Sequence, residues 1–308
     1  MGQLREASGE KRTKEATTNK SSTQCTVMCV YRTKIAGISR IVNVIWYKNL
    51  INNSVNISVD DPGNENQYNC KIDLKPWHFW IKKGLKSFTV GEKIVDVFWD
   101  LRSAKFSGSP EPTGDYYVAL VSDDELVLLL GDGKKEAYKK TKSKPSLIEA
   151  VLVCKQENVL GKKSFSTRAK FDERNKEQDI VVENSISGHR DPEMWISIDG
   201  IVMIHVRNLQ WKFRGNQTVL VNKTPVQVFW DVHDWLFSSH GFGHGTFLFK
   251  PSSQEYGSDS DKEGSKISGD SNSCCGRGSR SGGSGYLSTQ SCSPSPDFCL
   301  FLYAWKLV

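Results

Sequence analysis

The most distinctive chemistry in this sequence is a run of lysines near its middle. Ammonium groups at high density attract negatively charged surfaces, such as an anionic membrane or a phosphate backbone. Lysine dominates over arginine in the run, which favours diffuse charge attraction over bidentate recognition of single phosphates. The candidate anionic-surface site consists of six lysines within eleven positions: Lys134, Lys135, Lys139, Lys140, Lys142 and Lys144.

Other interpretations of this run stay open. Residues 134–170 carry a net charge of +8, whereas residues 171–199 carry eight acids against three bases, a net charge of −5. The two stretches can neutralise each other as an ordinary solvated face, and the sequence favours this outcome. Among binding partners it ranks a membrane or an acidic protein surface above nucleic acid.

A second group of reactive side chains lies further along the chain. His233, His240 and His244 fall within twelve positions, with Asp231 and Asp234 nearby. Imidazoles and carboxylates can hold a divalent metal or act as acid and base. Their spacing matches no closed metal site, so we expect no metal and no cofactor, and the three histidines are weak candidates. A metal-dependent or acid–base enzyme near Asp231 and His233 is the third functional alternative.

Other candidates have structural interpretations that we favour. Trp77, Phe79 and Trp80 can stack bases or lie at a lipid interface, but aromatic side chains more commonly fill the space between two sheets. Asp100 and Asp231 each follow a Phe-Trp pair. They can be paired acids, but Asp at a strand end more commonly accepts backbone N–H bonds.

The common catalytic motifs are missing from the sequence, including G-x-S-x-G, H-E-x-x-H and the P-loop. The 308 residues are 38% hydrophobic and 10% aromatic, enough for a core, and the net charge of +6 permits an acidic partner.

The eight cysteines include no C-x-x-C pair, which predicts free thiols. No long apolar run is present, and the first 23 residues lack a secretory signal. We expect an intracellular protein, cytoplasmic or nuclear or peripheral at a membrane.

The elements that must position these residues are predicted to be strands. Apolar residues alternate with polar ones in many short runs, such as Val55, Ile57 and Val59, and the only plausible helix lies within 134–150. Residues 1–23 and the Ser/Gly-rich segment 251–297 are predicted to be disordered. Residues 298–307 are apolar at both alternating sets of positions, which predicts a returning strand buried on both faces.

An internal repeat organises the prediction. Residues 80–106 and 211–237 align without gaps over 27 positions, and each copy reads as a hairpin that needs a second sheet to cover it. We therefore predict two related β-sandwich halves, 24–133 and 160–308, joined by a lysine-rich connector, 134–159. The nine identities are Trp80/Trp211, Gly84/Gly215, Val90/Val221, Val95/Val226, Val97/Val228, Phe98/Phe229, Trp99/Trp230, Asp100/Asp231 and Phe106/Phe237.

Four longer strings resemble a known family, the plant proteins with domain of unknown function 868. They are KPWHFW at 75–80, VFWDLRSAKF at 97–106, GKKSFSTRAKF at 161–171 and VFWDVHDWLF at 228–237. The resemblance covers about 24–250 and 298–307. It implies a soluble plant protein with no assigned activity and carries over no functional residues. The duplicated hairpin and the missing motifs favour a non-enzymatic binding or scaffold protein whose partner is another protein, with an anionic membrane surface as the alternative.

Overall fold

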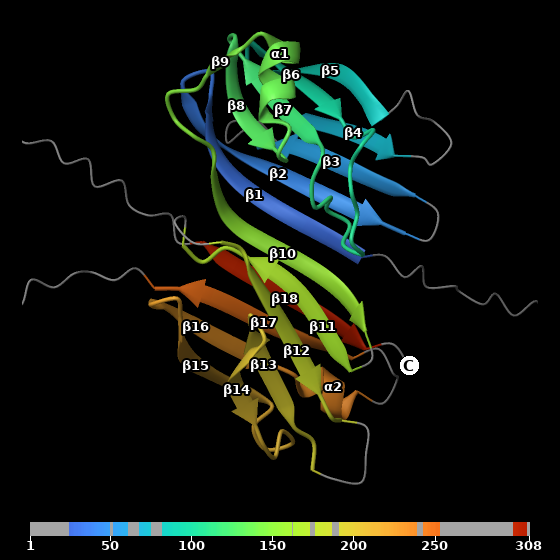
Figure 1. Cartoon of the computed structure of the whole chain (residues 1–308), viewed down its shortest axis with the longest axis vertical. Helices are drawn as coiled ribbons and strands as arrows, with labels where there is room; N and C mark the ends of the chain where they lie inside the picture. The colour runs from blue at the N-terminus through green and yellow to red at the C-terminus, as the bar shows by residue number, and fades with distance from the viewer. Residues whose placement is uncertain are drawn as a thin grey trace, which may run out of the picture.

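The computed structural model describes residues 25–49, 52–60, 68–74, 82–161, 163–172, 176–186, 191–238, 243–252 and 298–306. Within them the chain consists mainly of strands, which form three sheets (Figure 1). This confirms the predicted all-β class. The segments predicted to be disordered lie outside the described residues, apart from residues 251 and 252. The same is true of Trp77, Phe79, Trp80 and His240.

The first half of the chain contributes two runs of sequential antiparallel strands. The first run is β1 (Cys25–Ile35), β2 (Ile38–Lys48), β3 (Asn53–Val59) and β4 (Tyr68–Leu74). The second run is β5 (Lys83–Val90), β6 (Lys93–Asp100), β7 (Tyr117–Ser122) and β8 (Glu125–Leu130). Helix α1 (Lys134–Thr141) and the two-residue strand β9 (Lys144–Pro145) follow, and β9 pairs with β8.

The second half follows the long strand β10 (Val151–Gly161) and also contributes two runs of sequential antiparallel strands. Its first run is β11 (Ser164–Ala169), β12 (Gln178–Asn184), β13 (Met194–Ile198) and β14 (Ile201–Val206). Its second run is β15 (Arg214–Val221), β16 (Thr224–Asp231), β17 (His244–Pro251) and β18 (Cys299–Lys306), with the short helix α2 (His233–Phe237) between β16 and β17.

Strand β10 joins the two halves into one nine-stranded sheet, with the order β15-β16-β17-β18-β10-β1-β2-β3-β4. It pairs antiparallel with β1 and parallel with β18. Glu157 of β10 is opposite both Val27 of β1 and Leu302 of β18, so these three residues share one face of the sheet. Val27 belongs to the core of the first half and Leu302 to the core of the second. Both covering sheets therefore pack on the same face of the nine-stranded sheet.

Alternating burial explains why these residues form sandwiches. In β2, Val42, Val44 and Trp46 are almost fully buried, while the residues between them are only half-buried. The predicted period-2 pattern is thus the pattern of contact with the covering sheet. Each buried Val, Ile or Leu contributes about 1.5–3 kcal/mol relative to an exposed one.

The predicted returning strand is present as β18, between β17 and β10. The expectation that both of its faces are buried is wrong. Leu300, Leu302 and Ala304 are fully buried, but Phe301 and Tyr303 on the other face are half-buried and Trp305 is 37% exposed. No described sheet covers that outer face, because both covering sheets pack on the opposite one.

The two hairpins of the sequence repeat have the same register. Gly84 is opposite Trp99 in the β5–β6 hairpin, and Gly215 is opposite Trp230 in the β15–β16 hairpin. A Cβ atom at either glycine would overlap the indole ring beside it, so the flat ring requires glycine there. Each hairpin opens a run of four strands, but one lies in a covering sheet and the other in the shared sheet. The common origin of the halves stays a prediction.

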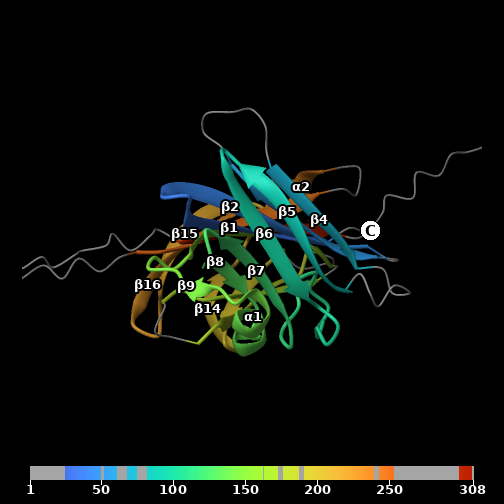
Figure 2. The same ribbon diagram turned by 90° about the horizontal axis from the view of Figure 1, so that it is seen from above.

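Residues 134–159, expected as a connector, contain regular structure throughout much of their length. They form α1, β9 and most of β10, and β10 is a central strand of the largest sheet. Helix α1 packs Ala137 against the outer face of β7 and β8, where Tyr117, Ala119 and Leu126 are buried. Viewed from above, α1 lies on the opposite side of β6 and β7 from β2 (Figure 2).

Candidate functional site

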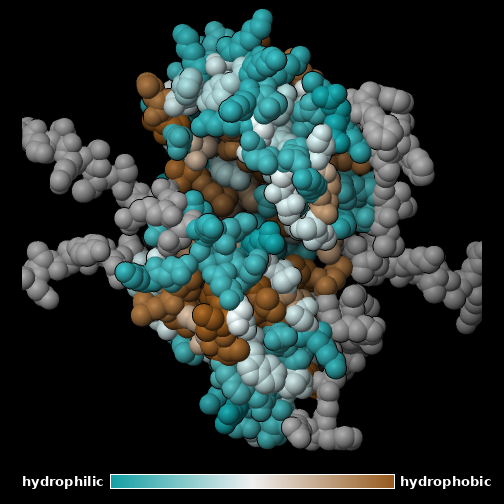
Figure 3. All heavy atoms as spheres, viewed as in Figure 1, coloured by the Kyte–Doolittle hydropathy of each residue, from teal (hydrophilic) through white to brown (hydrophobic). Residues whose placement is uncertain are grey.

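The structure places the six predicted lysines together at one end of the molecule. Lys134, Lys135, Lys139 and Lys140 lie on α1, Lys142 ends that helix, and Lys144 lies on β9. All six are exposed. We refer to these six residues as the lysine surface; it lies at the top of Figure 1, where the space-filling view is mainly hydrophilic (Figure 3).

Helix α1 has unfavourable local features. Its N-cap, Gly133, makes no side-chain capping bond, and Lys134 and Lys135 stand in the first turn, where the helix dipole disfavours positive charge. Lys135 and Lys139 form a like-charge i,i+4 pair, which destabilises a helix. Lys142 adopts the left-handed conformation (φ 56°) that favours glycine. Packing of Ala137 and Tyr138 against the sheet is therefore what holds α1 in place.

The lysine surface is not neutralised within the described part of the chain. None of its six lysines forms an ion pair there. Two nearby acids are engaged elsewhere, since Asp123 pairs with Lys93 at 2.9 Å and Glu125 accepts a hydrogen bond from Ser146 at 3.3 Å.

The proposed mutual neutralisation of residues 134–170 by residues 171–199 occurs at Arg168 but not at the lysine surface. The described acids of residues 171–199 lie on and beside β12 and β13, in the other half of the molecule from the lysine surface (Figure 1). Asp179 pairs with Arg168 at 2.8 Å, and Glu193 contacts His205 at 2.6 Å. The end of the basic stretch, β11, lies in the same sheet as these acids, whereas the six lysines lie on α1 and β9, in or beside a different sheet.

Sequence reasoning missed an apolar feature beside the lysine surface. Leu147 is 95% exposed and Ile148 is 49% exposed, in the loop that joins β9 to β10. Figure 3 shows a hydrophobic area over this loop, at the left edge of the upper half, next to the hydrophilic surface of α1. Two apolar residues in a short loop form no periodic pattern. The sequence therefore could not predict that Leu147 and Ile148 are exposed.

The predicted histidine group is only partly assembled. Asp234 Oδ1 lies 3.2 Å from His233 Nδ1, and Asp234 Oδ2 lies 3.7 Å from His244 Nδ1. The His233 ring packs against Phe213 and Phe237, and the His244 ring packs against Trp305. Within the described residues no three His, Cys, Asp or Glu side chains are arranged to hold a metal ion.

Asp100 and Asp231 anchor strand ends, as predicted. Oδ1 of each accepts a hydrogen bond from the backbone N–H two residues later, at 3.3 Å from Arg102 and 3.1 Å from His233. Asp100 also binds the Arg102 guanidinium, which holds the pKa of its carboxyl below the ordinary value. Burial raises the pKa of Asp231, but the bonds from Arg214 and His233 outweigh it and lower the pKa. These hydrogen bonds occupy both carboxylates with structural roles.

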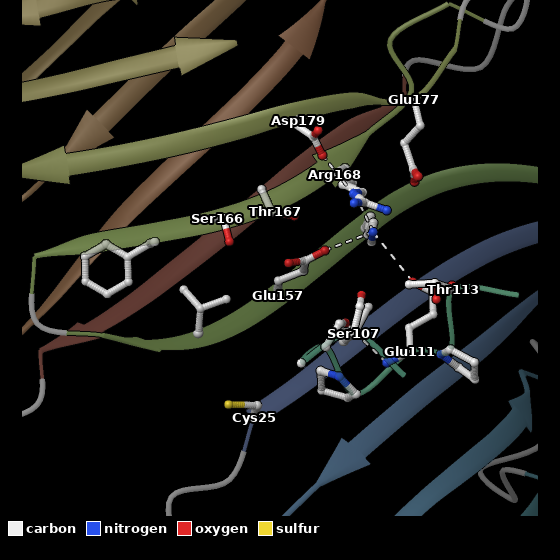
Figure 4. A pocket seen from close by; sticks show the side chains of 18 of the residues that line it. Cys25, Ser107, Glu111, Thr113, Glu157, Ser166, Thr167, Arg168, Glu177 and Asp179 are labelled. Carbon is white, nitrogen blue, oxygen red and sulfur yellow. Dashed lines mark hydrogen bonds and ion pairs between the residues drawn. The ribbon is translucent and has the colours of Figure 1, made fainter. Parts of the chain in front are cut away.

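A cleft that the sequence did not indicate lies over β10, between the two covering sheets. It has a volume of about 740 Å³. Its walls come from residues 107–114 between β6 and β7 and from β11 and β12, and its floor comes from β1 and β10 (Figure 4). Both halves therefore contribute to this cleft.

Lys155 of β10 ties the walls of the cleft together. Its Nζ lies 2.9 Å from Glu157 Oε1 on the same strand and 3.6 Å from Glu111 Oε2 of the first half, and it donates to the Arg168 carbonyl of the second half at 3.0 Å. Burial alone would lower the pKa of Lys155, but Glu157 and Glu111 raise it, so the ammonium stays charged. The ammonium group thus contacts oxygen atoms of both halves and of the shared strand.

The cleft carries an excess of acid. Its Lys, Arg, Asp and Glu side chains comprise the cations Lys155 and Arg168 and five acids, and both cations are occupied by ion pairs. Burial raises the pKa of Glu111, and the neighbouring charge of Glu177 acts in the same direction. The cleft is therefore suited to a polar ligand with positive charge rather than to an anion. The five acids are Glu111, Asp132, Glu157, Glu177 and Asp179.

These features define an all-β protein of two sandwiches that share one sheet, with a lysine surface at one end and an acidic cleft at the joint. A family model described as plant protein of unknown function (DUF868) matches residues 22–306, so the chain belongs to this family. The match confirms the resemblance noted in the sequence. No match was found among curated proteins.

None of the described helices is long and apolar enough to cross a membrane. The five described cysteines are free thiols: Cys25, Cys29, Cys70, Cys154 and Cys299.

Proposed function

We propose that this chain is a non-enzymatic binding protein that attaches to a negatively charged surface through its lysine surface. The observation that carries the proposal is that six exposed lysines gather on α1 and β9 without an ion pair among the described residues. The same residues weaken the helix that displays them. Sequences depart from local stability in this way chiefly at functional sites.

The expected strength of this attachment follows from the charge. Each lysine near an anionic membrane contributes about 1 kcal/mol, which corresponds to about fivefold in affinity. Glu136 and Glu149 lie in the same segment and reduce the net charge of residues 134–150 to +4. Binding should weaken steeply with salt, because exposed charges are screened over about 10 Å at 0.1 M. Since anionic lipids face the cytoplasm, the proposal also places the protein inside the cell.

The test is binding of the full chain to two polyanions, phosphatidylserine vesicles and heparin, between about 50 and 200 mM salt. Replacing the six lysines by Gln should abolish binding to at least one of them. The matched control removes six exposed lysines from the second half and should bind like wild type. Equal loss in both variants would show that net charge alone acts, and binding that ignores salt would exclude the proposal. The control residues are Lys163, Lys170, Lys176, Lys212, Lys223 and Lys250.

The cleft supports a second candidate, binding of a small polar ligand with positive charge. Glu177 makes no ion pair within the described residues, and it lines the cleft together with Glu111. Spermidine is a suitable probe, and it should raise the melting temperature of wild type more than that of Glu177→Gln. An equal shift in both would show that the amine binds elsewhere on the surface.

The enzymatic alternative near Asp231 and His233 has less support. Asp231 binds Arg214 at 2.8 Å and the His233 backbone N–H, and the His233 ring packs between aromatic rings. Reproducible turnover of a small molecule by the purified chain, lost in His233→Ala, would establish an enzyme and remove our leading proposal.

A further inference from the structure

The loop that joins β9 to β10 exposes apolar side chains to solvent, where they do not contribute to a hydrophobic core. Leu147 is 95% exposed, the highest value among the exposed large apolar side chains of the described residues, and Ile148 beside it is 49% exposed. The flanking residues on one side are Lys142 and Lys144 of the lysine surface. Cationic and apolar groups therefore occupy the same end of the molecule (Figure 3).

The base of this loop is fixed to the five-stranded sheet. The backbone N–H of Lys144 donates to Asp124 O at 2.8 Å, and β9 pairs with β8 through Glu125↔Lys144 and Leu126↔Pro145. Ser146 Oγ donates to Glu125 at 3.3 Å and accepts from the Ile148 N–H at 3.4 Å. Leu147 and Ile148 therefore lie on an anchored turn. Little conformational entropy of the loop is lost when the two side chains bind a partner.

We propose that Leu147 and Ile148 insert into the acyl layer of an anionic membrane while the lysine surface contacts the lipid headgroups. This inference rests on the proposed function and names its partner. A membrane offers negative charge with an apolar layer directly behind it, and the protein presents lysines with an apolar tip beside them. Neither signal alone gives firm anchoring, whereas a basic patch combined with one apolar insertion does.

Other anionic partners fit these observations less well. A nucleic-acid backbone would satisfy the lysines but leave Leu147 and Ile148 in water, since phosphate contacts involve no apolar layer. An acidic protein could cover both groups only with an apolar pocket aligned to the loop. The two surfaces on this chain correspond directly to the two layers of an anionic lipid leaflet.

The experiment measures co-sedimentation of the full chain with phosphatidylcholine vesicles, with and without phosphatidylserine. Heparin binding of the same samples is the reference. Leu147→Ser/Ile148→Ser should lower the affinity for anionic vesicles by about tenfold or more, because two aliphatic side chains no longer leave water. It should leave heparin binding unchanged. Both substitutions are on the surface, and a melting temperature equal to that of wild type shows that the fold is intact.

The matched control is Ile201→Ser/Leu220→Ser, which removes two exposed aliphatic side chains (67% and 64%) from the second half. It should bind anionic vesicles like wild type. The inference is overturned if the Leu147/Ile148 variant binds vesicles like wild type or loses heparin binding equally. It is also overturned if wild type binds heparin but no vesicle, which would point to nucleic acid. The proposed function itself fails if wild type binds neither polyanion, if its binding ignores salt, or if the six-lysine variant binds both polyanions like wild type.

Discussion

At the scale of single residues, Lys155 shows how a buried charge can join two cores. Its side chain is only 10% exposed and contacts acceptors from the first half, the shared strand and the second half. Lysine is almost never buried unless it is paired. The side chain of Glu157 is itself only 7% exposed, so the two charges depend on each other.

We predict that Lys155→Met lowers the free energy of unfolding by about 3–5 kcal/mol. The substitution leaves Glu157 buried without its cation, which is the costly way to break a buried ion pair. Urea denaturation at pH 7 measures the change, with Lys163→Met as the exposed control. Adding Glu157→Leu to Lys155→Met should recover part of the loss. If the single variant is as stable as wild type, the pair contributes nothing to the joint.

A pH dependence is predicted for Asp100, whose pKa is lowered first of all by its hydrogen bond from Arg102. A lowered pKa means that the folded state favours the carboxylate. The stabilisation is present above the unfolded value, about 3.8, and is lost as the pH falls through the folded value. Asp100→Asn should therefore destabilise by about 0.5–1 kcal/mol at pH 7, since the ion pair is partly exposed. The difference should vanish well below pH 3.8, as measured by urea denaturation across pH; a difference that persists there would have another cause.

At the scale of elements, α1 is a helix whose surface residues oppose its own stability. Its first turn carries Lys134 and Lys135 against a single acid, Glu136, and no side chain caps it. Packing of Ala137 and Tyr138 on the outer face of the sheet compensates for these features. The helix therefore serves mainly to expose its lysines and contributes little to the core.

Lys135→Glu provides a test of this trade-off. A Glu in the first turn suits the helix dipole, and it replaces the Lys135–Lys139 repulsion by a favourable i,i+4 pair. We predict a gain of about 0.5–1 kcal/mol in the free energy of unfolding, measured by urea denaturation, together with weaker binding to anionic vesicles. Lys223→Glu in the second half should leave vesicle binding unchanged. A stabilised variant that binds normally would show that α1 is not the contact surface.

At the scale of the whole molecule, β10 makes the two sandwiches one body. Its inward residues face the joint, and its two neighbours, β1 and β18, belong to different cores. Because β18 comes from the C-terminal end of the chain, neither half completes its sheet from local sequence alone.

We therefore predict one cooperative unfolding transition for the whole chain, with the calorimetric enthalpy equal to the van't Hoff enthalpy. Gln156→Pro should disrupt this coupling, because Gln156 is opposite Met28 on one side and Phe301 on the other, and proline cannot donate to the ladder. The variant should show a loss of stability or two separate transitions. Two transitions already in wild type would mean that the shared sheet does not couple the cores.

The sequence determined the local structure of this protein. Alternation in runs such as Val55, Ile57 and Val59 predicted strands, because a residue's burial in a sandwich follows its position in the pleat. The sequence repeat aligned Trp99 with Trp230, and the structure places each of them opposite a glycine. The sequence also predicted that the six lysines lie at the surface, since a dense run of charged residues is not buried.

Only the tertiary structure decided how these pieces combine. The sequence placed β10 in a connector because Lys155 and Glu157 interrupt its apolar pattern. The cleft that these two residues line forms only when both covering sheets are in place. The separation of the lysines from the acids of residues 171–199 and the exposure of Leu147 were likewise undetermined. Strand pairing is non-local, so alternation identifies a strand but not its neighbours or what faces it.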